Sequence, residues 1–193
     1  MELRIGVLAI QGDFAAHCRM LEPLGALVSE VRTPEQLVEL DGLVIPGGES
    51  TTITMGMARE GLDGAVRAFH ESGRPILGSC AGMIVCDRNH LGIGDYRCRR
   101  NAFGRQLQSF EEDLAVEGLG EEPIRAVFIR APWVEERGAE VEVLAEVRGH
   151  PVAVRQGSLL AVAFHAELTD DSRLHALFMA ACTAARSDDR AHR

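Results

Sequence analysis

The 193-residue sequence has few positive charges and lacks long apolar runs. Twenty arginines and no lysine stand against 29 aspartates and glutamates, which gives a formal net charge of −9. This balance argues against a nucleic-acid-binding protein, which normally presents a basic face, and against electrostatic attachment to anionic membranes. No apolar run approaches the ~18 residues of a membrane-spanning helix. We therefore expect neither a nucleic acid nor a membrane as a partner.

Paired cysteines are also missing. The five cysteines are odd in number and contain no C-x-x-C pair, so they predict neither a disulfide framework nor a zinc site. The first five residues enter a strand-like run without the basic region or cleavage site of a signal peptide. Together these features predict a protein of the reducing cytoplasm that holds no metal.

Strand-like and helical segments alternate along the first half of the chain. Continuous apolar runs, typical of buried parallel strands, occupy residues 3–10, 26–31, 42–45 and 75–77. Helical spacing occupies residues 14–24, 34–40, 53–60 and 62–71. This alternation with short connections predicts a doubly wound parallel sheet, in which ligands bind at the carboxyl ends of the strands.

The second half has a different pattern. Strand-like runs without clear helices between them lie at residues 110–116, 124–130, 141–147, 151–155 and 159–164, and an amphipathic helix follows at 174–185. These runs predict a mainly antiparallel extension, preceded by a loop at residues 87–96. We predict one α/β domain over residues 1–186, built as a three-layer, doubly wound, mostly parallel sheet with an antiparallel extension. Residues 187–193 are expected to form a disordered tail.

A Gly-x-Cys-x-Gly sequence at residues 78–82 lies between two apolar runs. This is the pattern of a nucleophile elbow, with Cys80 in place of the usual serine at the apex of a strand-to-helix turn. A β-carbon at Gly78 or Gly82 would clash in so sharp a turn. The dipole at the start of the following helix favours the Cys80 thiolate. The alternative is an inert, buried cysteine.

A cysteine nucleophile needs a base, and the base needs an orienting group. His165 follows the run at 159–164, and Glu167 lies two residues further on, a spacing that points both side chains the same way in extended chain. We predict His165 as the base and Glu167 as its orienting group, with a solvated loop as the alternative. His17 and His175 are expected on helix surfaces.

Two glycines, Gly47 and Gly48, follow the strand-like run at 42–45. Consecutive glycines let backbone N–H groups turn toward an oxyanion, and the N–H groups of Gly48 and Ala81 would form the oxyanion hole. A plain glycine-rich turn is the alternative. No Gly-Lys-Ser/Thr sequence follows, so no nucleotide site is predicted. Arg100 and Arg130 each adjoin a strand-like run and could bind a substrate carboxylate, although a solvated face is also compatible.

With these motifs in place, the chain resembles the class I glutamine amidotransferases, and more narrowly the PdxT family, the glutaminase subunits of pyridoxal 5′-phosphate synthase. The matching stretches span nearly the whole chain: Gln11-Gly12 and residues 46–52, 80–83, 100–106, 128–132 and 164–169. The stretches 100–106 and 128–132 are the most specific. The chain departs from the family pattern at Ser79, usually threonine, at Ala166, usually proline, and in a shortened segment between Met83 and Arg100.

The resemblance implies a reaction and a set of roles. Cys80 would attack the side-chain amide of L-glutamine, His165 would move the proton, and Glu167 would orient His165. The residues implied to hold glutamine are Gly48, Glu49, Ser50, Arg100, Ile129 and Arg130. Ammonia would pass to a (β/α)8-barrel synthase subunit in a large hetero-oligomer. No metal or bound cofactor is implied, because pyridoxal phosphate is the product of the complex.

Three other functions remain open at this point. The chain could serve a different ammonia acceptor with the same three residues, or act as a non-catalytic assembly subunit. It could also be a stand-alone cysteine hydrolase or redox chaperone on a similar sheet. The stretch 100–106 disfavours the first, and the combination of Cys80, His165 and Glu167 disfavours the second.

Overall fold

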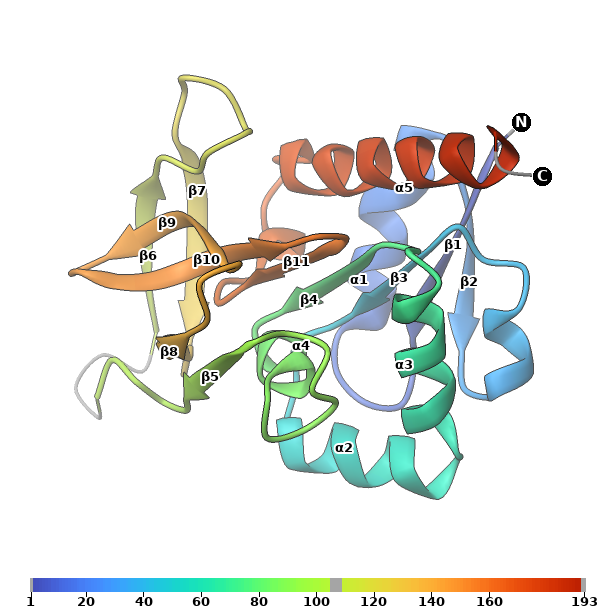
Figure 1. Cartoon of the computed structure of the whole chain (residues 1–193). Helices are drawn as coiled ribbons and strands as arrows, with labels where there is room; N and C mark the ends of the chain where they lie inside the picture. The colour runs from blue at the N-terminus through green and yellow to red at the C-terminus, as the bar shows by residue number, and fades with distance from the viewer. Residues whose placement is uncertain (1, 105–108, 192–193) are drawn as a thin grey trace.

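A computed structural model describes residues 2–104 and 109–191, and within them a seven-stranded sheet forms the centre of the molecule (Figure 1). Its strands, in spatial order, are β2 (Ala26–Val31), β1 (Leu3–Leu8), β3 (Gly42–Ile45), β4 (Ile76–Ser79), β11 (Leu159–Val162), β10 (His150–Gln156) and β9 (Glu142–Val147). The first five are parallel to one another, whereas β10 is antiparallel to both of its neighbours, β11 and β9. The predicted mostly parallel sheet with an antiparallel extension is therefore confirmed.

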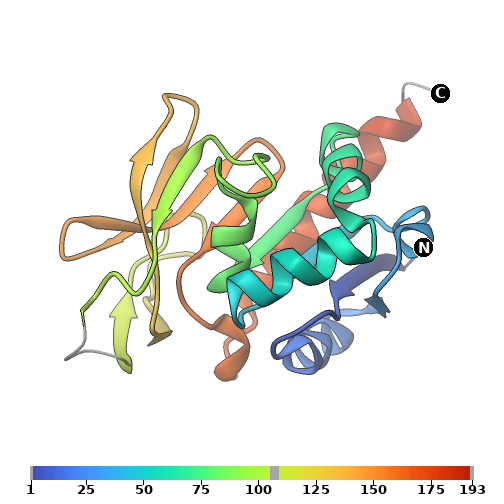
Figure 2. The ribbon, with the colours of Figure 1, turned by 90° about the horizontal axis from the view of Figure 1, so that it is seen from below.

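Helices cover both faces of the sheet, as Figures 1 and 2 show. One face carries α1 (Phe14–Leu21) and α5 (Arg173–Ala191), and the other carries α2 (Ser50–Arg59), α3 (Leu62–Glu71) and α4 (Ala81–Cys86). Short 3-10 turns are η1 (Glu22–Leu24), η2 (Pro34–Leu37) and η3 (Ala166–Leu168). Because the sheet is enclosed between helices, every residue of β3, β4 and β11 is buried, which explains their continuous apolar sequences.

The extension differs from the prediction in two respects. The run at 159–164 was expected in the antiparallel part, but β11 is parallel to β4, because the hairpin from β10 reverses the chain before β11 begins. The runs at 110–116 and 124–130 do not join the main sheet. They form a separate antiparallel ribbon of β6 (Ser109–Leu114) and β7 (Ile124–Ile129). A second ribbon pairs β5 (Tyr96–Arg99) with β8 (Trp133–Arg137), two short charged strands that the sequence pattern did not reveal.

The ribbon of β6 and β7 packs against the chain that leaves β11. The Phe128 ring contacts Phe164 edge-on with centroids 5.7 Å apart, and Phe110 stacks on Phe128 with centroids 4.6 Å apart. The backbone N–H of His165 donates to the Val127 carbonyl over 2.8 Å. These contacts explain why the ribbon stands apart from the sheet: its aromatic side chains, rather than an open strand edge, provide the attachment. They also place the end of β7 beside His165.

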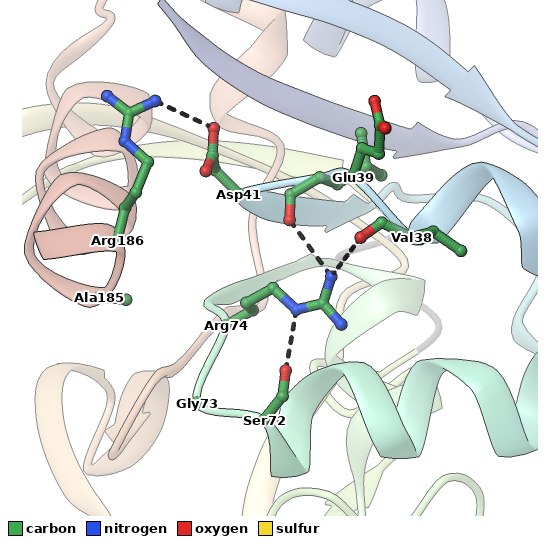
Figure 3. A pocket seen from close by; sticks show the side chains of 9 residues that line it. Val38, Glu39, Asp41, Ser72, Gly73, Arg74, Ala185 and Arg186 are labelled. Atoms are coloured by element: carbon green, nitrogen blue, oxygen red, sulfur yellow. Dashed lines mark hydrogen bonds and ion pairs between the residues drawn. The ribbon is translucent and has the colours of Figure 1, made fainter. Parts of the chain in front are cut away.

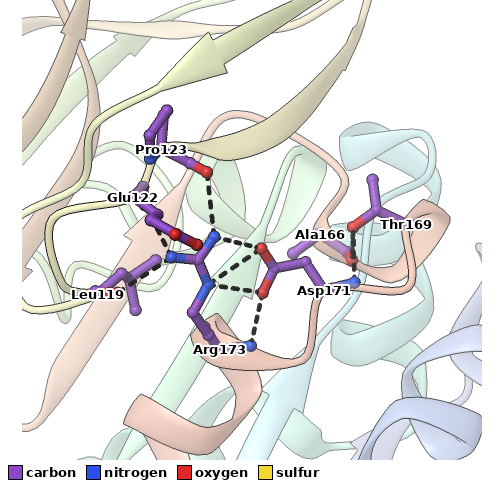
Figure 4. A network of polar contacts seen from close by, with 7 residues as sticks. All are labelled: Leu119, Glu122, Pro123, Ala166, Thr169, Asp171 and Arg173. Atoms are coloured by element: carbon purple, nitrogen blue, oxygen red, sulfur yellow. Dashed lines mark hydrogen bonds and ion pairs between the residues drawn. The ribbon is translucent and has the colours of Figure 1, made fainter.

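Arg173, at the start of α5, connects that helix to the loop before β7 (Figure 4). Its guanidinium donates to the carbonyl oxygens of Leu119, Glu122 and Pro123, at 3.3, 2.7 and 3.0 Å, and to the Asp171 carboxylate. The hydrogen bond from Arg173 lowers the pKa of Asp171. The segment between β11 and α5 is therefore fixed at its far end.

The expected disordered tail is helical over residues 187–191, because α5 continues to Ala191. Arg186 donates to the Glu2 carbonyl over 2.9 Å and contacts the Asp41 carboxylate at 3.3 Å, which holds this end of α5 against the chain start. Residues 192 and 193 lie outside the described residues, as do residues 105 and 106 of the stretch 100–106.

His17 of α1 and His175 of α5 are fully buried, so the prediction that they lie on helix surfaces was wrong. The two helices pack against each other, with His17 Nδ1 at 3.0 Å from His175 Nε2. Burial lowers the pKa of His17, and it lowers the pKa of His175 to about 4. Both rings are therefore neutral at pH 7.

This burial predicts a pH dependence of stability. Between the ordinary histidine pKa of 6.5 and the value of about 4 for His175, the unfolded chain binds a proton that the folded chain does not. The free energy of unfolding therefore falls as the pH falls through this window, by on the order of 3 kcal/mol for this one group. Urea unfolding at pH 7.0, 5.5 and 4.5 measures the loss.

The variant His175→Gln keeps a donor toward His17 but has no proton to gain, so its stability should fall less over the same range. Thr183→Ala, which removes a hydroxyl of α5 that does not titrate, is the control and should retain the wild-type slope. Equal slopes for wild type and His175→Gln would contradict the prediction.

Candidate active site

Cys80 stands at the apex of the turn between β4 and α4. Its backbone has φ 49° and ψ −103°, a strained conformation for a residue with a side chain, and its N–H donates to the Val162 carbonyl over 2.8 Å. A Cβ at Gly82 would collide with the Ile45 carbonyl oxygen, and one at Gly78 would lie 2.8 Å from the Gly82 carbonyl. The turn thus has the close approaches that the sequence predicted for a nucleophile elbow.

His165 and Glu167 follow β11 at the same edge of the sheet. His165 Nδ1 lies 2.7 Å from Glu167 Oε1, and Glu167 has no exposed side-chain surface. Burial lowers the pKa of His165, but hydrogen bonds with Cys80 and Glu167 outweigh it and raise the pKa to about 10. Burial likewise raises the pKa of Glu167, and the hydrogen bond from His165 reverses this and lowers it. The structure therefore joins Cys80, a protonated His165 and an ionised Glu167 in one chain of contacts.

The other oxygen of Glu167 has neighbours that the sequence reasoning missed. The Ser79 hydroxyl lies 3.3 Å from Glu167 Oε2 and 3.1 Å from the Phe164 carbonyl oxygen. His17 Nε2 lies 3.4 Å from the same Oε2. The sequence could have indicated Ser79 as a site residue, since it adjoins Cys80 in the elbow. His17 carried none, because its contact depends on how α1 packs.

One cavity of about 410 Å³ gathers the predicted site residues at the carboxyl ends of the strands. It is lined by Gly48, Glu49, Ser50, Cys80, Ala81, Arg100, Ile129, Arg130 and His165, and further by Gln11, Ile84, Asn101 and Pro132. Glu167 lies behind His165 and does not line the cavity. Gln11, at the carboxyl end of β1, could have been found by the reasoning that singled out Gly48, because both follow buried parallel strands.

The loop after β3 passes close to the nucleophile. A Cβ added at Gly47 would lie 2.5 Å from His165 Cε1 and 3.3 Å from Cys80 Cβ, so only glycine lets the backbone approach both side chains. The Gln11 side-chain oxygen accepts from the Glu49 N–H over 2.7 Å and holds the loop from the other side. The backbone that precedes Glu49 is therefore within reach of a group bound to Cys80.

Glu49 and Arg100 pair with each other on the cavity wall. The Glu49 carboxylate caps α2 by accepting from the N–H groups of Thr51 and Thr52, at 3.2 and 2.8 Å, and Arg100 Nη2 contacts it at 2.7 Å. The hydrogen bond from the Thr52 N–H is the main reason that the pKa of Glu49 falls to about 2. The Ser50 hydroxyl, next along the wall, is buried and has no hydrogen-bond partner among the described residues. The wall thus offers a fixed anion, a cation and an unsatisfied hydroxyl.

A second cavity, of about 370 Å³, lies at the opposite edge of the sheet (Figure 3). Asp41 and Arg74, which precede β3 and β4, line it together with Arg186 of α5. Arg74 there donates to the carbonyl oxygens of Val38 and Leu40. Its described lining includes no cysteine or histidine, so the cavity at Cys80 is the better candidate for chemistry.

The described residues lack two features that would indicate another type of protein. They contain no group of three or more His, Cys, Asp or Glu side chains placed to hold a metal ion. In the same part of the chain, no helix has the length and apolar character needed to cross a membrane.

Comparison with known proteins connects this geometry to a family. A family model described as the SNO glutamine amidotransferase family matches residues 7–184. A Niallia circulans protein named pyridoxal 5′-phosphate synthase subunit PdxT is 51% identical over 184 residues, covering 92% of this chain and 96% of that protein. A Frankia alni protein of the same name is 55% identical over 185 residues, covering 91% and 93%.

A solved structure agrees with these relatives. A crystal structure described as a glutamine amidotransferase matches with a TM-score of 0.86 at 46% identity, covering 93% of this chain and 98% of that one. The fold is therefore that of the class I glutamine amidotransferases, as the sequence resemblance predicted. With the family model spanning nearly the whole chain and relatives about half identical to it, the chain belongs to the SNO glutamine amidotransferase family.

Proposed function

We propose that the chain is the glutaminase subunit of a pyridoxal 5′-phosphate synthase. It hydrolyses L-glutamine to glutamate and ammonia and delivers the ammonia to a synthase subunit for vitamin B6 biosynthesis. The observation that carries the proposal is the 2.7 Å contact of His165 with Glu167 in line with Cys80, at one end of a cavity walled by Glu49 and Arg100. The names of the relatives support the particular ammonia acceptor.

The reaction follows from the protonation states. The Cys80 thiolate attacks the side-chain amide carbon of glutamine, and the N–H groups of Gly48 and Ala81 stabilise the oxyanion. His165, which carries a proton at pH 7, gives it to the departing ammonia and becomes neutral. Neutral His165 then accepts a proton from water as the water attacks the thioester, which releases glutamate and restores the Cys80 thiolate with a protonated His165.

The cavity wall suits the zwitterionic end of glutamine. Glu49 stays ionised because the backbone N–H of Thr52 stabilises the carboxylate, and it would bind the α-ammonium group. The guanidinium groups of Arg100 and Arg130 would bind the α-carboxylate. Ser50 and Ile129 complete the predicted contacts, and the Ser50 hydroxyl would gain the partner that it lacks in the described residues.

The partner in this proposal is a (β/α)8-barrel synthase subunit that receives ammonia through a tunnel within a cytoplasmic hetero-oligomer. The relatives are named as subunits, which supports a partnered enzyme. The glutaminase chemistry itself uses thiol, imidazole and carboxylate groups, so the proposal assigns this chain neither a metal nor a cofactor.

Replacement of the nucleophile provides the first test. In the complex of this chain with its cognate synthase, Cys80→Ala should lower kcat for ammonia release from glutamine by at least about 10⁴-fold, because no other group on the cavity wall replaces a thiolate. A coupled glutamate dehydrogenase assay measures the ammonia. Cys18→Ala, on α1 and absent from the cavity lining, is the matched control and should keep wild-type activity. Undiminished activity of Cys80→Ala would rule out the mechanism.

A second test compares the isolated chain with the complex. We expect weak or no glutamine hydrolysis alone and clear hydrolysis once the synthase is added, because docking would orient the Gly47-Gly48 loop for the oxyanion and avoid wasted ammonia. The same ammonia assay, titrated with the synthase subunit, gives the activation. An inactive wild-type chain in a complex verified by sedimentation would instead support a non-catalytic assembly subunit.

A further inference from the structure

Two imidazoles lie on the side of Glu167 that faces away from the cavity. His17 Nε2 is 3.4 Å from Glu167 Oε2, and His17 Nδ1 is 3.0 Å from His175 Nε2. The side chains of His17 and Glu167 have no exposed surface, and His175 is fully buried. A continuous line of polar groups therefore runs from Cys80 through His165, Glu167 and His17 to His175, deep between α1 and α5.

The ionised Glu167 carboxylate determines which ring nitrogens of His17 and His175 carry protons. Glu167 is ionised and can only accept, so the ring nitrogen of His17 that faces it must carry the proton. A neutral imidazole has one N–H, so His17 Nδ1 must accept from His175 Nε2–H. His175 Nδ1 is then a bare nitrogen, in agreement with its having no partner among the described residues. His17 Nε2 also forms no hydrogen bond among them, so its 3.4 Å approach to Glu167 Oε2 is a charge–dipole contact. Both histidines thus point their donors toward Glu167.

The charged surroundings of His17 favour this arrangement. The groups that act on it are Glu167, His165, Asp13 at the start of its own helix, and His175 on α5. Burial disfavours a charge on either histidine, so the pair supplies dipoles and not a second cation. These residues do not form a metal site, since no such group occurs in the described part of the chain.

The Ser79 hydroxyl does not remove the need for His17. It has one proton and two acceptors, the Phe164 carbonyl at 3.1 Å and Glu167 Oε2 at 3.3 Å, so it cannot donate fully to both. Whenever Ser79 donates to Phe164, the remaining described N–H group beside Oε2 is that of His17, which lies at 3.4 Å without hydrogen-bond geometry. A buried carboxylate oxygen without a donor loses its hydration without compensation.

We propose that His17 is a positioning residue of the glutaminase reaction, which fixes Glu167 Oε2 so that Oε1 stays on His165, and that His175 sets the tautomer of His17. The inference rests on the proposed function for its kinetic consequence. Its structural consequence is separate: loss of the His17 donor weakens the hold of Glu167 on protonated His165, and this shifts formation of the Cys80 thiolate to higher pH.

Two amide variants isolate the contact. The Gln amide nitrogen reaches the place of His Nε2, whereas the Asn amide nitrogen reaches only that of Nδ1. His17→Gln should therefore retain a donor for Glu167, and His17→Asn should lose it while remaining polar and small. The readout is the rate of Cys80 alkylation by iodoacetamide as a function of pH in the full chain, followed by mass spectrometry of the peptide that contains Cys80. This readout requires neither the synthase nor glutaminase activity.

We expect His17→Asn to move the midpoint of the alkylation profile upward by about one pH unit, a tenfold lower thiolate fraction below the midpoint. His17→Gln should stay within a few tenths of wild type. Arg186→Ala is the control for stability alone, because it removes contacts to Glu2 and Asp41 at the end of α5 remote from Glu167. It should lower the urea midpoint of unfolding and leave the alkylation profile in place.

Coincident profiles for His17→Asn and wild type, with a lowered urea midpoint like that of Arg186→Ala, would overturn the proposal and leave His17 a packing residue. If His17→Asn does not fold, His17→Leu takes its place beside His17→Gln, because the two side chains are similar in size and only Gln has a donor. A raised midpoint for His17→Leu alone supports the proposal, and equal midpoints for the two variants contradict it. In the active complex, His17→Asn should lower kcat about tenfold with KM unchanged. Absence of glutaminase activity in wild type would refute the proposed function but leave the alkylation test readable.

Discussion

A carboxylate without exposed surface lies between β4, α1 and the segment after β11, and the neighbouring elements keep it ionised. An unpaired charge at such a place would lose its hydration without compensation. Glu167 avoids this because His165 contacts one oxygen at 2.7 Å, while Ser79 and His17 approach the other. Each donor comes from a different part of the chain, so the carboxylate is stable only when the sheet, α1 and η3 are assembled. The buried anion in turn keeps His165 protonated beside Cys80.

The parallel sheet brings the remaining groups together. Because β1, β3, β4 and β11 are parallel, their carboxyl ends meet at one edge, where Gln11, Gly47, Cys80 and His165 follow them. The ribbon of β6 and β7 completes the cavity from the side, since its attachment at Val127 and Phe128 sets Ile129 beside the thiol. Cys80 Sγ lies 3.9 Å from the Ile129 carbonyl oxygen. The site is thus formed by the carboxyl-terminal edge of the sheet together with the ribbon of β6 and β7.

The sequence predicted the elements that depend on local pattern or on strand polarity. Alternating apolar and helical segments revealed the parallel half, and the residues after each buried strand revealed Cys80, His165 and Gly48. The sequence could not show contacts that depend on helix packing. His17 on α1 and His175 on α5 are separated by 158 positions, and each resembles a polar residue on an amphipathic helix until the helices are placed together. The prediction of strand direction in the second half failed because a hairpin and a crossover connection leave similar patterns in short apolar runs.

The departures at Ser79 and Ala166 show that the site is held by its neighbours more than by local stiffness. A proline between His165 and Glu167 would restrict the backbone, yet with Ala166 at the first position of η3 the two side chains still meet at 2.7 Å. The serine hydroxyl at position 79 reaches both Phe164 and Glu167 without the methyl group of threonine. Three sets of contacts hold this segment: the hydrogen bond from the His165 N–H to the Val127 carbonyl, the ion pair of Arg173 with Asp171, and the histidines behind Glu167. Because these contacts already restrict the backbone between His165 and Glu167, a proline at position 166 is not needed to keep the two side chains together. The residue at this position can therefore vary while the geometry of the site is retained.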